Sequence, residues 1–163
     1  MEKQEQEMAD KYELLILGIG NILLGDEGFG VHVVRELEKY DLPSGVTVMD
    51  GGTGGEDLVF WIEDAERLIV VDAIDAGAEP GTLFRFRDGD LDLASVEHPL
   101  SLHDSSFVNV LQLARLRGCL PETTVFAVQV ESIDWGLALT PRVQEAVPRV
   151  IKAIELELSA IMS

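Results

Sequence analysis

The chain has 163 residues, a length that suits one domain with its own buried core. Its 30 acidic and 12 basic residues give a net charge of −18, which argues against nucleic acid and anionic membrane surfaces as partners, because both need a basic footprint. A single cysteine excludes a disulfide framework and a cysteine-based zinc site, and it agrees with a reducing compartment. No apolar run reaches the length of a membrane span. We therefore expect a cytoplasmic protein.

The N-terminal residues 1–10 are charged and polar. This composition fits neither a signal peptide nor a membrane anchor, and it predicts a frayed tail. We therefore expect a single domain over residues 11–163.

The first predicted element is a strand at residues 14–17, an uninterrupted apolar run typical of a central strand that is covered on both faces. Gly18 and Gly20 follow and predict a tight turn. Asp26 and Glu27 come next, directly before a helical pattern begins. The sequence therefore places a pair of carboxylates at the carboxyl end of the first strand.

A dinucleotide-binding loop would need a third glycine where this chain has Leu23. Asp26 and Glu27 would also repel a pyrophosphate from the start of the helix. Hard anionic oxygen atoms suit a metal cation or acid–base chemistry instead.

The rest of the chain alternates helices with short strands. Strands are expected at residues 46–49, 67–71, 82–87 and 123–130. A first helix is expected at residues 28–40, and a second follows a capping box formed by Thr53 and Glu56. A third helix ends at Arg117, and the last begins at Pro141 with Thr140 as its cap. The amphipathic strand at 82–87 suits a sheet edge, with an antiparallel orientation as one alternative. A long acidic loop over residues 88–102 precedes His103, at the edge of the next helix.

This order predicts a single-domain α/β fold, a three-layer sandwich with a doubly wound, mostly parallel sheet of about five strands and helices on both faces. Ligands of such sheets bind outside the carboxyl ends of the strands, where the strand order reverses. Glu27 and Asp72, which follows the strand at 67–71, both belong to that edge. If the sheet winds first one way and then the other, these two carboxylates converge.

Together with a histidine, two carboxylates would form an oxygen and nitrogen cluster suited to zinc, nickel or iron. Each residue also has a simpler explanation, because acidic residues after strands commonly cap helices or close turns. His103 could cap its helix in the same way, and His32 on the first helix is expected to be solvated. Four other acidic residues compete for a role in the site: Asp26, Asp50, Asp75 and Glu131.

Residues 18–30, with the sequence GIGNILLGDEGFG, closely resemble the N-terminal signature of the nickel–iron hydrogenase maturation endopeptidases. Further segments occur in that family's order, namely residues 50–53, 71–73, 101–103 and 139–141 with Gly136 before them. The resemblance covers residues 14 to about 161, nearly the whole chain.

The resemblance implies a hydrolase that removes a C-terminal extension from the nickel-loaded large-subunit precursor of a nickel–iron hydrogenase. It implies a metal-binding trio at Glu27, Asp72 and His103, with Glu27 and Asp72 as the catalytic carboxylates of an aspartic-type endopeptidase. Separately from the resemblance, His98 on the long loop is the reserve ligand if His103 turns away from the site. Nickel would arrive with the substrate, and zinc or another divalent ion could substitute for it. Whether the carboxylates also activate water is left open by the resemblance.

Two other classes of function stay open from the sequence. One is a flavodoxin-like ligand-binding module without catalysis, against which the carboxylates of Asp26 and Glu27 argue. The other is a noncatalytic assembly scaffold, which would bind the precursor without shortening it. The particular hydrogenase, the cleaved bond, the oligomeric state and the roles of Asp26, Asp50 and His98 do not follow from the sequence.

Overall fold

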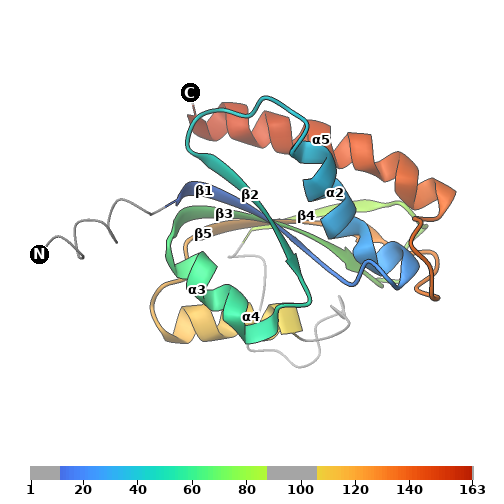
Figure 1. Ribbon diagram of the computed structural model, residues 1–163, viewed down its shortest axis with the longest axis horizontal. Coiled ribbons are helices and arrows are strands. Elements are labelled where there is room, and N and C mark those ends of the chain that lie inside the picture. Colours follow the sequence, from blue (N-terminus) through green and yellow to red (C-terminus); the bar gives the residue numbers. More distant parts are fainter. Residues whose placement is uncertain (1–11, 88–105, 163) are drawn as a thin grey trace, which may run out of the picture.

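The structure is a computed structural model that describes residues 12–87 and 106–162, with the side chains of residues 106–109 outside that description. A five-stranded sheet of order β2-β1-β3-β5-β4 forms the centre (Figure 1). The strands are β1 Tyr12–Ile19, β2 Val46–Gly52, β3 Ala65–Ile74, β4 Leu83–Arg87 and β5 Glu122–Gln129. The helices are α2 Phe29–Leu37, α3 Leu58–Glu63, α4 Ser106–Leu116 and α5 Pro141–Met162, with short 3₁₀ turns η1 Gly25–Gly28 and η2 Gly55–Asp57.

Four strands of the sheet are parallel, and β4 pairs with β5 in the antiparallel direction. Helices α2 and α5 cover one face of the sheet, and α3 and α4 cover the other (Figure 1). The predicted three-layer, doubly wound α/β fold is confirmed, including the antiparallel edge strand. None of the helices in the described part of the chain has the length and apolar character to cross a membrane.

The interior strand β1 contributes side chains to both hydrophobic cores, one on each face of the sheet. Leu14 and Ile16 point into the core with α2 and α5, whereas Leu15 and Leu17 point into the core with α3 and α4. All four side chains are fully buried, because alternate residues of a strand face opposite sides of the sheet. The uninterrupted apolar run is therefore a consequence of burial on both faces.

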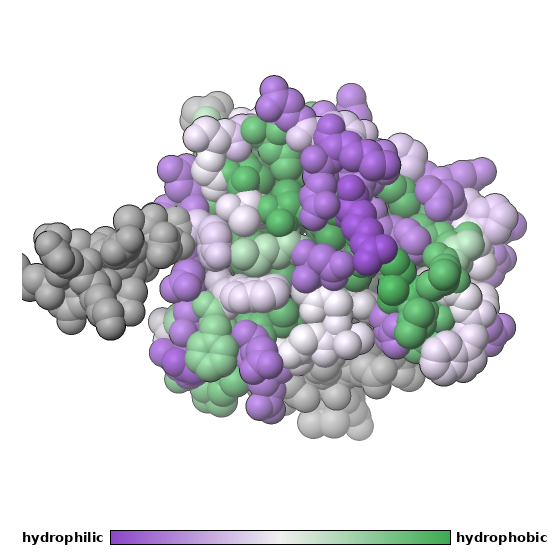
Figure 2. Space-filling view, in the orientation of Figure 1, coloured by the Kyte–Doolittle hydropathy of each residue, from purple (hydrophilic) through white to green (hydrophobic). Residues whose placement is uncertain are grey.

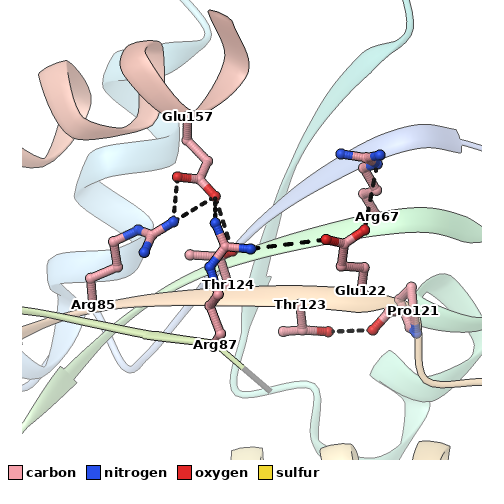
Figure 3. Close-up of polar contacts among 8 residues, drawn as sticks. All are labelled: Arg67, Arg85, Arg87, Pro121, Glu122, Thr123, Thr124 and Glu157. Atoms are coloured by element: carbon pink, nitrogen blue, oxygen red, sulfur yellow. Dashed lines mark hydrogen bonds and ion pairs between the residues drawn. The ribbon is translucent and has the colours of Figure 1, made fainter. Parts of the chain in front are cut away.

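The antiparallel strand β4 is held to the last helix by a polar network at the sheet edge (Figure 3). The carboxylate of Glu157 on α5 accepts two hydrogen bonds from Arg85, of 2.9 and 2.7 Å, and one of 3.2 Å from the hydroxyl of Thr124. Arg87 lies 3.7 Å from the same carboxylate and 3.9 Å from Glu122. Charged side chains on an edge strand also discourage pairing with a further strand.

Some sequence predictions about local structure were wrong. The expected capping box at Thr53 and Glu56 does not form, because the chain turns through η2 and neither η2 nor α3 has a side-chain cap hydrogen bond. The predicted tail at residues 1–10 and the acidic loop after β4 lie outside the described residues.

Candidate functional site

The strand order reverses between β1 and β3, since β2 lies on one side of β1 and β3 on the other. A pocket of about 380 Å³ opens near this point, at the carboxyl edge of the sheet. Its lining consists of Glu27, Ala73, Ile74, Asp75, Val130, Glu131 and Ile133. The residues come from η1, from the end of β3 and from the loop after β5, so three distant parts of the sequence build the pocket.

Asp72 lies inside β3 and not directly after it, because the ladder with β5 continues to the pair Ile74 and Gln129. The ladder with β1 ends earlier, at the pair Gly18 and Val71. Asp72 is therefore the first residue of β3 beyond the end of its ladder with β1, which leaves that side open toward η1.

The Asp72 carboxyl group is partly buried, and its Oδ1 accepts a 2.8 Å hydrogen bond from the backbone N–H of Ala73. Burial raises the pKa of Asp72 from 3.8 to about 7; the hydrogen bond from Ala73 lowers the pKa, and the negative charge of Glu27 raises it. Glu27 and Asp72 are thus close enough to influence each other's charge. A carboxyl group with such a pKa can gain or lose a proton near neutral pH.

Glu27 reaches the site because the backbone of its segment packs directly on the sheet. A side chain at Gly30, at the start of α2, would collide with the carbonyl oxygens of Val71 and Ile19. Gly20 has a φ of 139°, and a side chain there would collide with the carbonyl oxygen of Glu27. These glycines allow η1 to lie against the ends of β1 and β3.

Asp26 has a different environment from its neighbour Glu27, since its side chain is fully buried. Its Oδ2 accepts hydrogen bonds from the N–H groups of Glu131 and Ser132, at 2.9 and 3.0 Å, and from the hydroxyl of Thr140, at 2.8 Å. Its Oδ1 accepts a 2.7 Å bond from the N–H of Thr140. Asp26 therefore fixes the loop between β5 and α5 and has no access to the pocket's solvent.

The predicted third ligand, His103, lies outside the described residues, as does the reserve ligand His98. Within residues 12–87 and 106–162, no group of three or more histidine, cysteine or acidic side chains is arranged to hold a metal ion. The structure brings Glu27 and Asp72 together, and the membership of His103 stays a prediction.

The other acidic residues that compete for a role in the site have different environments. Asp50 closes a turn by accepting a 2.9 Å bond from the N–H of Gly52, and it lies 3.6 Å from Arg35. Asp75 and Glu131 line the pocket, and the side chain of Gln129 donates a 3.1 Å hydrogen bond to Asp75. The sequence alone presents both only as competitors for a role in the site.

The expectation that His32 is solvated was wrong. Its Nε2 atom is buried and has no hydrogen-bond partner among the described residues. Burial lowers the pKa of His32, the charge of Arg35 lowers it further, and a hydrogen bond with the backbone of Leu137 raises it. No local pattern in the sequence reveals this environment, because the backbone of Leu137, which contacts His32, lies more than a hundred positions away.

These features define a class of protein, namely a doubly wound α/β domain with a carboxylate pair at its ligand-binding edge. The family model described as hydrogenase maturation protease matches residues 31–157. The chain is 44% identical over 137 residues to the hydrogenase expression/formation protein HupD of Bradyrhizobium diazoefficiens, an alignment that covers 82% of this chain and 71% of the relative. It is also 38% identical over 155 residues to the coenzyme F420 hydrogenase subunit delta of Methanothermobacter thermautotrophicus, covering 87% and 92% of the two chains.

Among solved structures, the hydrogenase maturating endopeptidase HybD from Escherichia coli superposes with a TM-score of 0.81 at 34% identity, covering 91% of this chain and 93% of that chain. The maturation protease HybD from Thermococcus kodakarensis gives a TM-score of 0.72 at 26% identity, covering 88% and 97%. The chain belongs to the hydrogenase maturation protease family. It is accordingly an endopeptidase, which confirms the enzyme class predicted from the sequence.

Proposed function

We propose that this endopeptidase removes a C-terminal extension from the nickel-loaded large-subunit precursor of a nickel–iron hydrogenase, in the cytoplasm, and that Glu27, Asp72 and His103 bind the precursor's nickel. Family membership supports the reaction class. The observation that carries the assignment of the site is the electrostatic coupling of Glu27 and Asp72 beside a pocket at the carboxyl edge. The structure describes two members of the trio, and His103 enters from the family resemblance.

The raised pKa of Asp72 has a consequence for metal binding. A cation that reaches the two carboxylates favours their ionised forms, so its binding releases the proton that Asp72 holds near neutral pH. Two oxygen ligands and one nitrogen ligand leave coordination positions free for groups of the precursor. Nickel is then part of the substrate, and it joins the precursor to the enzyme.

Peptide hydrolysis needs a base that takes a proton from water as the water oxygen attacks the scissile carbonyl carbon, and the leaving amine must gain a proton. A carboxylate with a pKa of about 7 has the driving force for the first transfer near neutral pH. Asp72 is our candidate for that role when it is not a metal ligand. A role of Asp72 as metal ligand and a role as general base predict different responses of the processing activity to added metal.

The rival functions have clear signatures. A flavodoxin-like binding module would purify with stoichiometric flavin or nucleotide, which the family assignment does not favour. A noncatalytic scaffold would bind the precursor and leave its mass unchanged.

The test is to incubate the purified protein with nickel-loaded precursor and weigh the products by mass spectrometry. We expect one shortened large subunit and one released C-terminal peptide. Glu27→Gln should abolish this product, whereas Glu131→Gln, which removes a carboxylate from the same pocket, should retain it. An unshortened precursor with wild-type protein would overturn the proposed function.

A further inference from the structure

Four large apolar side chains are exposed together beside the pocket, on the loop after β1 and on the loop between β5 and α5. Leu23 is 48% exposed, Ile133 53%, Trp135 80% and Leu137 66%. We call these four residues the apolar patch. Figure 2 shows hydrophobic surface gathered at the right-hand side of the molecule, in the region where Figure 1 places these two loops. Exposed apolar residues that cluster in this way mark interaction sites on soluble proteins.

The two loops are joined to each other by backbone hydrogen bonds. Gly136 donates a 2.8 Å bond to the carbonyl oxygen of Leu23, and Gly25 donates a 2.9 Å bond to the carbonyl oxygen of Gly136. The buried carboxylate of Asp26 fixes both ends of the second loop, at Ser132 and at Thr140. The apolar patch is therefore held in place before any partner arrives, which reduces the entropy lost on binding.

The patch is continuous with the candidate active site, because Ile133 lines the same pocket as Glu27. A chain bound across the patch would lead directly to the carboxylates. This position favours the substrate as the occupant over a partner that binds elsewhere on the molecule.

The charged residues of the two loops that carry the apolar patch are all acidic. Residues 18–30 and 130–141 contain no lysine or arginine. Glu131 and Asp134 are exposed in these loops and Glu27 lines the pocket, whereas Asp26 is buried and adds no surface charge. Two copies of this chain would bring like charges together at such an interface, on molecules that each carry a net charge of −18. An apolar segment flanked by basic residues is the complementary partner.

We propose that the apolar patch docks an apolar, basic-flanked segment of the large-subunit precursor and so directs the precursor's C-terminal extension to the pocket. This inference rests on the proposed function. The patch then contributes binding energy that is used equally in the bound substrate and in the transition state, so its loss should raise KM and leave kcat unchanged.

The first test compares Leu137→Ser with Leu156→Ser in the precursor-processing assay. Leu137 and Leu156 are 66% and 64% exposed, and Leu156 lies more than three turns into α5, away from the pocket. We expect Trp135→Ser and Leu137→Ser each to raise KM for nickel-loaded precursor by about tenfold or more, with kcat within about twofold of wild type. Leu156→Ser should match wild type.

The second test detects binding without cleavage. The chain has two tryptophans, Trp61 on α3 and Trp135, so protein labelled with 5-fluorotryptophan should give two ¹⁹F resonances, assigned with Trp61→Phe. Unlabelled nickel-loaded precursor should shift the Trp135 resonance and leave the chemical shift of Trp61 in place. Sedimentation of the free protein, before and after Trp135→Ser, reports self-association through the patch.

The outcomes separate the two proposals. If wild type shortens the precursor and the patch variants keep its KM, the docking inference is wrong and the proposed function stands. If wild type shortens nothing but the Trp135 resonance shifts, the patch docks the precursor and the proposed function fails. An unshifted Trp135 resonance, or a wild-type dimer that Trp135→Ser dissociates, overturns the docking inference.

Discussion

Replacing Asp26 by asparagine should destabilise the fold, because the buried carboxylate accepts four hydrogen bonds that an amide cannot reproduce. Asparagine has one carbonyl oxygen, so its NH₂ group must occupy the position of one carboxylate oxygen. In the better orientation the oxygen replaces Oδ2 and the NH₂ group faces the backbone N–H of Thr140. That buried N–H is left unsatisfied, and the three remaining bonds lose their charge-assisted character.

The magnitude follows from these contacts. An unsatisfied buried donor costs about 1 to 3 kcal/mol, and bonds to a charged group are about twice as strong as neutral ones. We expect Asp26→Asn to lower the free energy of unfolding by about 3 kcal/mol, measured by urea denaturation at pH 7. For a domain of this size the thermal midpoint should fall by about 6 to 12 °C.

Asp134→Asn is the matched control for Asp26→Asn. Asp134 lies in the same loop, but it is exposed, and its carboxylate accepts a single 3.2 Å hydrogen bond from a side chain of the described residues, that of Ser132. Its replacement should change the free energy of unfolding by less than about 0.5 kcal/mol. An Asp26→Asn variant as stable as this control would refute the structural role of Asp26. Because Asp26→Asn is expected to destabilise the fold, it is unsuitable as a control for Glu27→Gln in the processing assay.

Three further predictions concern the two carboxylates of the site and the network at the sheet edge. Asp72→Asn should abolish processing and yet raise the thermal midpoint at pH 8. The pKa of Asp72 in the folded protein, about 7, lies above the ordinary 3.8, so the stability that the neutral carboxyl group gives is fully present below pH 3.8 and is lost as the pH rises to about 7. The stability advantage of Asp72→Asn over wild type should therefore grow across that pH window. An Asp72→Asn variant with no gain in thermal midpoint at pH 8 would contradict this prediction. Glu27→Gln should lose processing while its thermal midpoint moves by no more than about 2 °C, and a large fall in the midpoint would instead indicate a structural role. Glu157→Gln weakens the ion pairs with Arg85 and Arg87, so we expect a loss of about 1 kcal/mol in urea denaturation with normal processing, and an equal loss in 1 M salt would argue against an electrostatic cause.

The sequence predicted the fold well because burial leaves a direct record in residue type. The apolar run at residues 14–17 required a strand covered on both faces, and β1 has that position. The amphipathic residues of β4 likewise recorded an edge strand. Since Asp72 follows an apolar run and Glu27 follows the first turn, the rule for carboxyl edges of parallel sheets predicted that the two would converge.

The different roles of Asp26 and Glu27 could not be predicted from the sequence. The two residues are adjacent and chemically similar, and their roles differ because η1 turns one carboxylate into the protein and the other into the pocket. The partners of Asp26 lie more than a hundred positions away, at Ser132 and Thr140, so no local pattern reveals them. The helix before β3 is present as α3, but the capping box expected at its start does not form, because the chain enters the helix through a 3₁₀ turn.

The most direct test of the account is whether nickel in the precursor, and not metal in the enzyme, permits cleavage. Enzyme treated with chelator and then freed from it should be mixed with nickel-loaded and with nickel-free precursor, and the products weighed by mass spectrometry. We predict full processing of nickel-loaded precursor by the treated enzyme, and none of nickel-free precursor at any enzyme concentration. Loss of activity that returns only when metal is added back to the enzyme would contradict the account, and it would show that the carboxylates of Glu27 and Asp72 serve a catalytic ion of the enzyme itself.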